Sequence, residues 1–435
     1  MQGRDKMFIH AGMILVVMVV AFAVARLLKL TIELSMFVAA IAGALAHGAG
    51  IPVRHIVDGA FTYYDVCLIF ITATFFMNLL KEAGGITYII RSIITTFHQQ
   101  RLVCLSLLTL VLLIPGALTG SGTVTVLVAG TLVGTVLIYM GISETRTAAI
   151  IFLCAAMSAA APPINLWAMM AAAGSNMPYV GFMRPLLVIT VCGALLSMFI
   201  LGWKGKPVDL EKALKELPTP PEKMNFFRVV LPFLVFFALV VAGRIWPFQM
   251  PILGLPLMFL ISAISVVLIS PKKLPVLQIA SATIRQLIPL VGIMIVVGVL
   301  IQIMALSGAR GLISLGVVTL PLTVLYATLW LILPWSEGLV QYAVAPLLGV
   351  PLILLFNMKG LDPIIALSAM AVMWPLGDCL PPTSVVGRAA VIELKYKGSY
   401  YGEFVKTCLG PMAIILLICT LFIIFSKPLN FLVGW

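Results

Sequence analysis

Charged residues are scarce in this chain. Only 10% of its 435 residues are Asp, Glu, Lys or Arg, against about 25% in a typical soluble protein. Histidine occurs four times, and the seven cysteines are scattered without a CxxC pair. A disulfide framework and a transition-metal centre both need clustered ligands, so neither is expected. The cysteines are expected to pack as small apolar side chains.

Apolar residues dominate instead, at 62% of the chain with a mean hydropathy of +1.18. Long apolar runs recur along the whole length, for example at 11–25, 287–303 and 411–425. With its flanking residues, each run can cross about 30 Å of hydrocarbon as a helix. The sequence therefore predicts an all-α polytopic membrane protein embedded in a lipid bilayer.

The net charge of +12 does not indicate nucleic-acid binding, because the basic residues lie in short loops beside apolar spans. Nineteen of the 27 Lys and Arg residues fall on the side of the linker at 204–226. By the positive-inside rule, that linker is cytoplasmic and both termini are periplasmic, in a bacterial inner membrane. The N-terminal run resembles a signal peptide, but 11–26 has a counterpart at 231–244, so it is taken as the first span.

A pattern of helix-breaking residues occurs twice. The first copy has Pro115, Gly130, Gly141 and Pro162-Pro163, and an offset of 219 residues gives the second copy, which consists of Pro334, Gly349, Gly360 and Pro381-Pro382. A duplicated membrane segment with matching breaks is typical of transporters built from two repeats. We predict a first repeat at 1–203, a cytoplasmic linker at 204–226 and a second repeat at 227–435.

Each repeat is predicted to hold five spans, one of them broken at Pro-Pro, and a hairpin. Because five is odd, the second repeat is inverted relative to the first. The hairpins are expected to be re-entrant, since Gly and hydroxyl residues at a tip are costly against lipid; two full crossings are the alternative that arm length permits. The predicted segments are 9–28, 33–50, 62–80, hairpin 102–140, 146–174 and 185–203, then 227–245, 251–270, 286–304, hairpin 321–357, 364–389 and 409–426.

The candidate ion- and substrate-binding residues lie at the two hairpin tips and the two broken spans. Unwound turns expose backbone carbonyls, and helix N-termini offer positive dipole ends to anions. A Pro-Pro step removes two backbone donors and leaves carbonyls free. The candidates are Thr119, Ser121, Gly122 and Thr123 at the first tip; Pro162, Pro163 and Asn165 at the first break; Ser336, Glu337 and Gly338 with Gln341 at the second tip; and Asp378, Pro381, Pro382, Thr383 and Ser384 at the second break.

Carboxylates in apolar surroundings are the next signal, because they are costly in a membrane and indicate function. Asp378 lies inside the second break, where the first repeat has Ala159, so we expect a cation or proton ligand in one half only. Glu337 is either a second such group or part of a wet vestibule. Arg388 either pairs with Asp378, binds a substrate carboxylate, or marks a cytoplasmic span end. Two further acids near span starts are expected at the interface: Glu33 and Asp65.

At these motifs the chain resembles the large membrane subunit of tripartite ATP-independent periplasmic (TRAP) transporters, over residues 30–425. The resemblance rests on Gly120-Ser121-Gly122-Thr123, Gly360-Leu361-Asp362-Pro363 and the two Pro-Pro pairs. It implies an elevator mechanism and sodium-driven import of small organic anions such as C4-dicarboxylates. A periplasmic binding protein and a small membrane subunit are the implied partners. The family's roles for hairpin tips and unwound spans would fall on Ser121, Gly122, Asn165, Ser336, Thr383 and Ser384. With Asp378 added for its place in the second break, the implied sodium ligands are Ser121, Asn165, Ser336, Asp378 and Thr383.

Asp378 and the Ser336-Glu337-Gly338 segment depart from the TRAP pattern, so a stand-alone sodium- or proton-coupled organic-anion symporter is the alternative. An intramembrane aspartyl protease would need Asp65 and Asp378 side by side, and Pro375 stands where its motif needs Gly. A channel would be distinguished by single-channel currents. We therefore expect a secondary transporter, not an enzyme, with no cofactor beyond a coupling Na⁺, and leave a homodimer open.

Overall fold

A computed structural model describes residues 2–246, 248–249 and 251–434, and the side chains from residue 8 onward. Within this part the regular secondary structure is entirely helical. Nine of its helices are long and apolar enough to cross a membrane. The predicted all-α, multi-span membrane fold is therefore confirmed.

The first half contains every predicted segment. Its third span consists of two helices, α3 and α4, and the turn between the hairpin arms falls at Gly120-Ser121, as expected. The elements are α1 (Gln2–Leu27), α2 (Ile32–Ala46), α3 (Val53–Phe61), α4 (Tyr64–Glu82), α5 (Gly85–Phe97), α6 (Arg101–Thr119), α7 (Gly122–Thr125), η1 (Val126–Gly130), α8 (Thr131–Tyr139), α9 (Glu144–Ala160), α10 (Leu166–Gly174) and α11 (Met183–Gly202).

The second half repeats this order, and η1, α8, α9 and α10 have counterparts that begin 219 residues later as η3, α18, α19 and α20. After the linker helix α12 (Leu210–Glu216), the elements are α13 (Phe226–Ile245), α14 (Gly254–Ile269), α15 (Val276–Leu306), α16 (Ala309–Val318), α17 (Leu322–Val340), η2 (Gln341–Ala343), η3 (Ala345–Gly349), α18 (Val350–Met358), α19 (Pro363–Met373), η4 (Trp374–Cys379), α20 (Val385–Glu393), η5 (Tyr400–Val405), α21 (Lys406–Ile424) and η6 (Pro428–Leu432).

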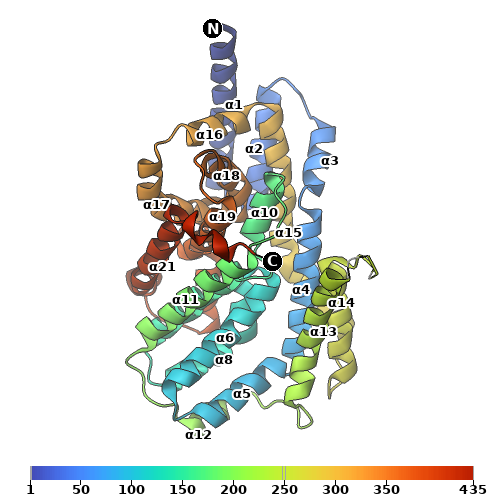
Figure 1. The fold of residues 1–435 in the computed structure, drawn as a ribbon, viewed down its shortest axis with the longest axis vertical. Helices are drawn as coiled ribbons and strands as arrows, with labels where there is room; N and C mark the ends of the chain where they lie inside the picture. The colour runs from blue at the N-terminus through green and yellow to red at the C-terminus, as the bar shows by residue number, and fades with distance from the viewer. Residues whose placement is uncertain (1, 247, 250, 435) are drawn as a thin grey trace.

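Three helices were not predicted. Helix α3 precedes the predicted third span at 62–80, and α5 and α16 each follow the third span of their half. In α5, Ile86, Ile90 and Ile94 are buried at a spacing of four, which gives the helix one apolar face. It packs against the hairpin arms α6 and α8, as α16 packs against the arm α18. Figure 1 places α5 and α16 at opposite ends of the molecule, and the two hairpins likewise extend to opposite ends.

The helices pack in two groups. The first, which we call the scaffold, comprises α1–α4 and α13–α15, and its main contacts join α1 with α2, α15 with α2 and α3, and α14 with α4 and α13. The second, the hairpin group, comprises both hairpins, both broken spans and the final spans α11 and α21. The hairpin group places the broken spans of the two halves against each other, because α9 contacts both η4 and α20. The site described below lies where these two groups meet.

Of the residues predicted at the second hairpin tip, Gln341 lies at the turn, whereas Ser336, Glu337 and Gly338 do not. Ser336, Glu337 and Gly338 lie inside α17, which runs on to Val340 despite its internal Pro334. Ser336 donates its hydroxyl to the Leu333 carbonyl oxygen (2.7 Å), a bond within the helix. The turn falls at Gln341, which has φ 53° and ψ −142°. The expectation of an unwound Ser336–Gly338 tip is therefore wrong.

The linker is held against the end of the molecule that carries α5 (Figure 1). Arg91 of α5 donates to the carbonyl oxygens of Leu214 (3.0 Å) and Leu217 (2.9 Å). The predicted short linker helix is present as α12, and the Asp209 carboxylate accepts from the Lys212 backbone N–H at its start. A hydrogen bond from the Lys212 side chain lowers the pKa of this exposed carboxyl.

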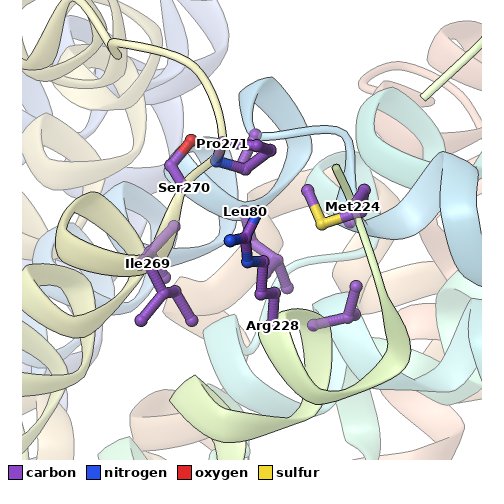
Figure 2. A pocket seen from close by; sticks show the side chains of 10 residues that line it. Leu80, Met224, Arg228, Ile269, Ser270 and Pro271 are labelled. Atoms are coloured by element: carbon purple, nitrogen blue, oxygen red, sulfur yellow. The ribbon is translucent and has the colours of Figure 1, made fainter. Parts of the chain in front are cut away.

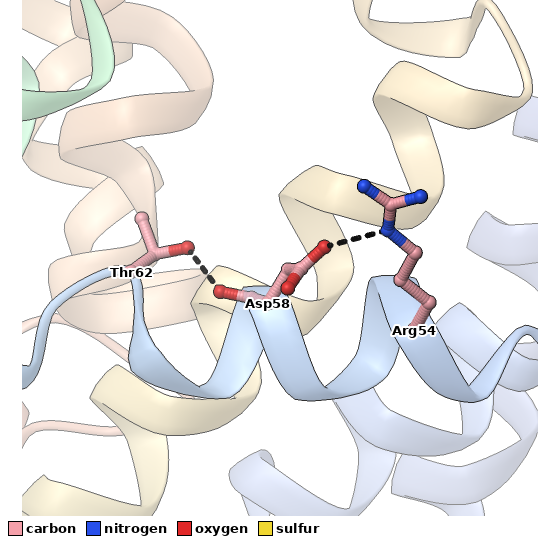
Figure 3. A network of polar contacts seen from close by, with 3 residues as sticks. All are labelled: Arg54, Asp58 and Thr62. Atoms are coloured by element: carbon pink, nitrogen blue, oxygen red, sulfur yellow. Dashed lines mark hydrogen bonds and ion pairs between the residues drawn. The ribbon is translucent and has the colours of Figure 1, made fainter.

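A polar network runs along the surface of α3, from Arg54 near its start to Thr62 just after its end (Figure 3). Arg54 Nε lies 3.6 Å from Asp58 Oδ2, with 90% and 59% of the two side chains exposed. The Thr62 hydroxyl donates to the Asp58 carbonyl oxygen (3.1 Å). An exposed pair of this kind contributes at most about 1 kcal/mol. The pair indicates position more than stability. Exposed charges of this kind lie in water or among lipid headgroups, so they mark where the span ends.

Candidate transport site

Both broken spans bind back to the hairpin of their own half in the same way. After Pro162-Pro163, the Ile164 N–H donates to the Ala117 carbonyl oxygen of α6 (3.1 Å). After Pro381-Pro382, the Thr383 N–H donates to the Gly338 carbonyl oxygen of α17 (3.2 Å), and its hydroxyl donates to the same atom (2.9 Å). Both Pro-Pro peptide bonds are cis. Each break thus fixes one hairpin tip near the middle of the molecule.

In the first half, a buried serine links the hairpin to the broken span. The Ser158 hydroxyl of α9 accepts from the Gly116 N–H, donates to the Leu113 carbonyl oxygen and lies within hydrogen-bond distance of the Thr125 hydroxyl, each at 2.8 Å. Gly116 leaves no room for a side chain here, since a Cβ would overlap Ser158. The polar groups of this contact are therefore neutral and mutually satisfied.

Asn165 at the first break is bonded at both ends of its amide. Its side-chain oxygen accepts from the Ala168 N–H (2.9 Å) and so caps α10, while Nδ2 donates to the Ala160 carbonyl oxygen (2.8 Å). Residues of this kind are preferred at helix N-caps because they satisfy orphan backbone N–H groups. Asn165 thus bridges the two halves of the broken span.

The second half contains two buried carboxyl groups. Glu337 of α17 is 0% exposed, and its Oε2 accepts from the Trp167 indole N–H at 2.8 Å. The Trp167 ring stacks on Tyr342, with centroids 4.6 Å apart. Asp378 of η4 is 4% exposed, and the residue before it, Gly377, lies against Gly338, the residue after Glu337. The position opposite Asp378 in the first half is Ala159, so this buried carboxyl has no counterpart in the first break.

A cavity of about 230 Å³ lies between the scaffold and the hairpin group. Both hairpin tips, η4 and the start of α20 form one side of it, and α4 and α15 form the other. Its polar lining comes from hydroxyl, amide and carboxyl groups, and no Lys or Arg is among the described residues that line it. These polar residues are Ser121, Thr123, Gln286, Gln341, Tyr342 and Asp378.

Of the five residues implied as sodium ligands, only Ser121 and Asp378 line this cavity. Ser336 lines a separate apolar cavity of about 260 Å³ beside α1 and α2. Asn165 and Thr383 are bonded to backbone groups as described above. Among the described residues no cluster of three His, Cys, Asp or Glu side chains could hold a metal ion.

The remaining predicted residues are spread around this centre. Thr119 is buried and donates to the Pro115 carbonyl oxygen (2.8 Å), and Ser384 donates to that of Leu380 (2.8 Å). Arg388 is exposed, and its guanidinium carbon lies 5.8 Å from the centre of the Tyr400 ring. Gly122 packs against Ala155 and Val386, and Gly338 packs against Leu380 and Pro381. Pro381 and Pro382 are exposed.

The first Pro-Pro pair, Pro162 and Pro163, borders a different and larger cavity of about 800 Å³. Helices α13 and α14 form most of its wall, with Phe236 and Met258 among the lining residues. A further hollow lies where α4, α13 and α14 meet, and Figure 2 shows the Arg228 side chain extending among its lining residues. At about 10 Å³ it has space for little more than one water molecule.

The sequence reasoning missed four residues at the centre. Tyr342 and Gln286 line the cavity, Trp167 binds Glu337 and Ser158 joins α6 to α9. Tyr342 directly follows the predicted tip residue Gln341, and Gln286 is an amide inside an apolar span, so both could have been found by a search for polar groups within spans. Trp167 and Ser158 give no such signal, since each is a common packing residue whose partner is remote in sequence.

Comparisons with known proteins agree with this architecture. No family of known proteins matches the sequence, and no curated protein matches it either. Among solved structures, the chain is similar to MtrF of Neisseria gonorrhoeae, described within a class of antimetabolite efflux pumps, with a TM-score of 0.61 and 14% identity over 86% of this chain and 83% of MtrF.

The fold is also similar to the YdaH transporter of Alcanivorax borkumensis, described as having an unusual topology. The TM-score is 0.58, with 15% identity over 87% of each chain. At this level of identity the likeness concerns the fold, which is that of a membrane transporter. It does not extend to the narrower TRAP resemblance.

Proposed function

We propose that this chain is a secondary active transporter whose cargo occupies the central cavity. The observation that carries the proposal is the position of that cavity, where both hairpin tips and the second break meet α4 and α15. Discontinuous helices that meet between two structural repeats are the usual place of a transport site. The described lining is uncharged except for Asp378, which is the natural ligand for an accompanying monovalent cation.

The proposed movement is that of an elevator, in which the hairpin group slides against the scaffold. The division of the helices into two packed groups supports it, because the cavity lies at their boundary. The repeat boundaries at 1–203 and 227–435, with a cytoplasmic linker at 204–226 and periplasmic termini in a bacterial inner membrane, are part of the same proposal. The repeat boundaries are supported by the elements that match at a constant offset in the two halves.

The proposed cargo is a small solute that is neutral or carries one negative charge. A cavity of about 230 Å³ is below the usual size of drug-binding pockets, about 300–1,000 Å³. The absence of Lys and Arg from its described lining disfavours a dicarboxylate, which would bring two uncompensated charges. The TRAP resemblance predicts import, sodium as the coupling ion, a binding protein and a small membrane subunit, and these stay predictions. A homodimer is left open.

Uptake into proteoliposomes tests the proposal. A panel of radiolabelled short monocarboxylates, dicarboxylates and neutral analogues is offered under inward Na⁺ or H⁺ gradients. We expect accumulation of at least one monoanionic or neutral compound above protein-free vesicles, and its loss when an ionophore collapses the gradient. Flux equal to protein-free vesicles for the whole panel would count against a carrier, and accumulation of dicarboxylates alone would contradict the cargo class.

Chemical modification then tests the place of the cargo. In a Cys192→Ser background, which removes the exposed thiol among the described cysteines, Thr123→Cys puts a thiol in the cavity wall. A charged thiol reagent should block uptake, and the transported compound should slow the reaction. The matched control is Thr135→Cys in α8, a half-buried threonine outside the lining. Equal inhibition of both variants would place the route elsewhere.

A further inference from the structure

The carboxyl group of Glu337 is buried with one hydrogen bond for two oxygens. The residue is 0% exposed. Oε2 accepts from Trp167 Nε1 at 2.8 Å, while Oε1 has no hydrogen-bond partner among the described residues. A buried ionised carboxylate normally binds several donors, because losing its hydration is very costly. The surroundings of Glu337 do not meet this requirement.

The charged and titratable groups around Glu337 supply no compensating cation. Helix α17 packs against η4, which carries Asp378 and Cys379, and against η2, which carries Tyr342. The neutral Trp167 of α10 donates to Glu337 itself. The ion pairs Arg54–Asp58 and Lys212–Asp209 both lie on the surface and involve neither Glu337 nor Asp378. Two negative charges held together without a cation would each cost several kcal/mol. At most one of the two carboxyls is therefore ionised.

The two carboxyls differ in their access to the cavity. Asp378 lines the cavity and is 4% exposed, whereas Glu337 is 0% exposed and is not among the described residues that line it. A metal ion at Glu337 would need several oxygen ligands, but its nearest partner is an indole N–H, which is a donor only. A proton needs no such ligand shell. The unpartnered Oε1 offers a place for a carboxylic acid proton.

We propose that Glu337 carries the transported proton and that Asp378 exchanges this proton with the cavity, so that the coupling ion is H⁺. The inference rests on the proposed transport function and names its coupling ion. In the transfer, the Asp378 carboxyl loses its proton and becomes a carboxylate, while the Glu337 carboxylate gains it and becomes the acid. The pair keeps a single negative charge throughout, as the absence of a cation requires.

Infrared difference spectroscopy of the full chain in lipid vesicles tests where the proton is. The probe is the proton itself, followed through the C=O stretch of a protonated carboxylic acid at neutral pH, with choline or sodium as the buffer cation. We expect the band in wild type, its loss in Glu337→Gln and its retention in Asp378→Asn. Glu33→Gln, a half-buried acid in a span that contacts α15, is the matched control and should keep the band.

A band that survives in Glu337→Gln, or that is lost in Asp378→Asn, would overturn the proposal. The Gln substitution keeps an oxygen for the Trp167 donor, and an unchanged thermal unfolding midpoint checks that the fold is intact. In proteoliposomes with a lumenal pH dye, Glu337→Gln should also lose pH-gradient-driven accumulation at least tenfold. Wild-type flux that depends on the Na⁺ gradient and not on the pH gradient would refute proton coupling but not the proposed transport function. Absence of any wild-type flux would refute the transport function itself.

Discussion

The two hairpin–break units of this chain share one architecture and differ in their polar groups. In both, a backbone N–H that follows the Pro-Pro step donates to a hairpin carbonyl oxygen, from Ile164 to Ala117 and from Thr383 to Gly338. The first unit adds a neutral, satisfied network around Ser158. The second unit has Gly377 at the position of Ser158, followed by the acid Asp378.

This difference indicates a division of labour between the halves. A satisfied network such as that of Ser158 stabilises one arrangement, because breaking it would orphan buried groups. The second unit holds carboxyls whose partners are incomplete, which costs stability and is typical of functional sites. We infer that the first unit mainly maintains the fold and that the second carries the ion chemistry.

The largest expected effect comes from giving Gly377 a side chain. Its Cβ would overlap the backbone carbonyl oxygen of Pro334, which cannot rotate away. Gly377→Ala should destabilise the protein by about 3 kcal/mol or more through overpacking, seen as a lower thermal unfolding midpoint. Gly410→Ala is the control, since a Cβ there meets no atom within 4 Å. Equal midpoints for the two variants would show that the α17–η4 contact is loose.

Removal of the Ser158 hydroxyl should have the next largest effect. Ser158→Ala leaves the buried Gly116 N–H without its acceptor, at a cost of about 2 kcal/mol. Ser197→Ala is the matched control, because that buried hydroxyl bonds only a carbonyl of its own helix, Gly193 (2.8 Å). Thermal unfolding of the two variants in the same detergent gives the comparison. A control as destabilised as Ser158→Ala would remove the structural role assigned to the first unit.

A smaller effect is expected for the indole that binds Glu337. Trp167→Phe deletes the donor to Oε2, whereas Trp374→Phe removes an equally buried indole N–H that has no partner among the described residues. Both changes remove the same volume, so the hydrogen bond makes the difference. We expect Trp167→Phe to be less stable than Trp374→Phe by about 1 kcal/mol. Thermal unfolding of both measures it, and the opposite order would contradict this role of Trp167.

The sequence alone predicted the spans, both breaks and the first tip, because each depends on local signals. Apolar length sets a span, and Pro or Gly ends one. It failed at Ser336–Gly338, where hydroxyl and small residues suggested a turn but α17 continues to Val340. A Gly or Ser residue inside a helix gives the same sequence signal as a Gly or Ser residue at a turn, and only the packing distinguishes them.

The composition of the cavity could be predicted only in part. Ser121 and Asp378 were identified as polar groups near helix breaks, and both line it. Gln286 of α15 lines the same cavity from the other packed group. It lies far from both residues in the sequence, so no local pattern predicts that they share a cavity. Asn165 and Thr383 were chosen for their oxygens, but those oxygens lie beside backbone groups that bind them. Residue type predicts what an atom can bind, and the fold decides what it does bind.

The most direct test of the central claim is ion-driven solute accumulation by Asp378→Asn, compared with Asp362→Asn. The Asp362 carboxylate caps α19 by accepting from the Ile364 and Ile365 N–H groups at 2.9 Å, and Asn caps a helix equally well. We predict that Asp378→Asn lowers accumulation in proteoliposomes at least tenfold and that Asp362→Asn matches wild type. Wild-type accumulation by Asp378→Asn would contradict the assignment of this cavity as the coupled transport site.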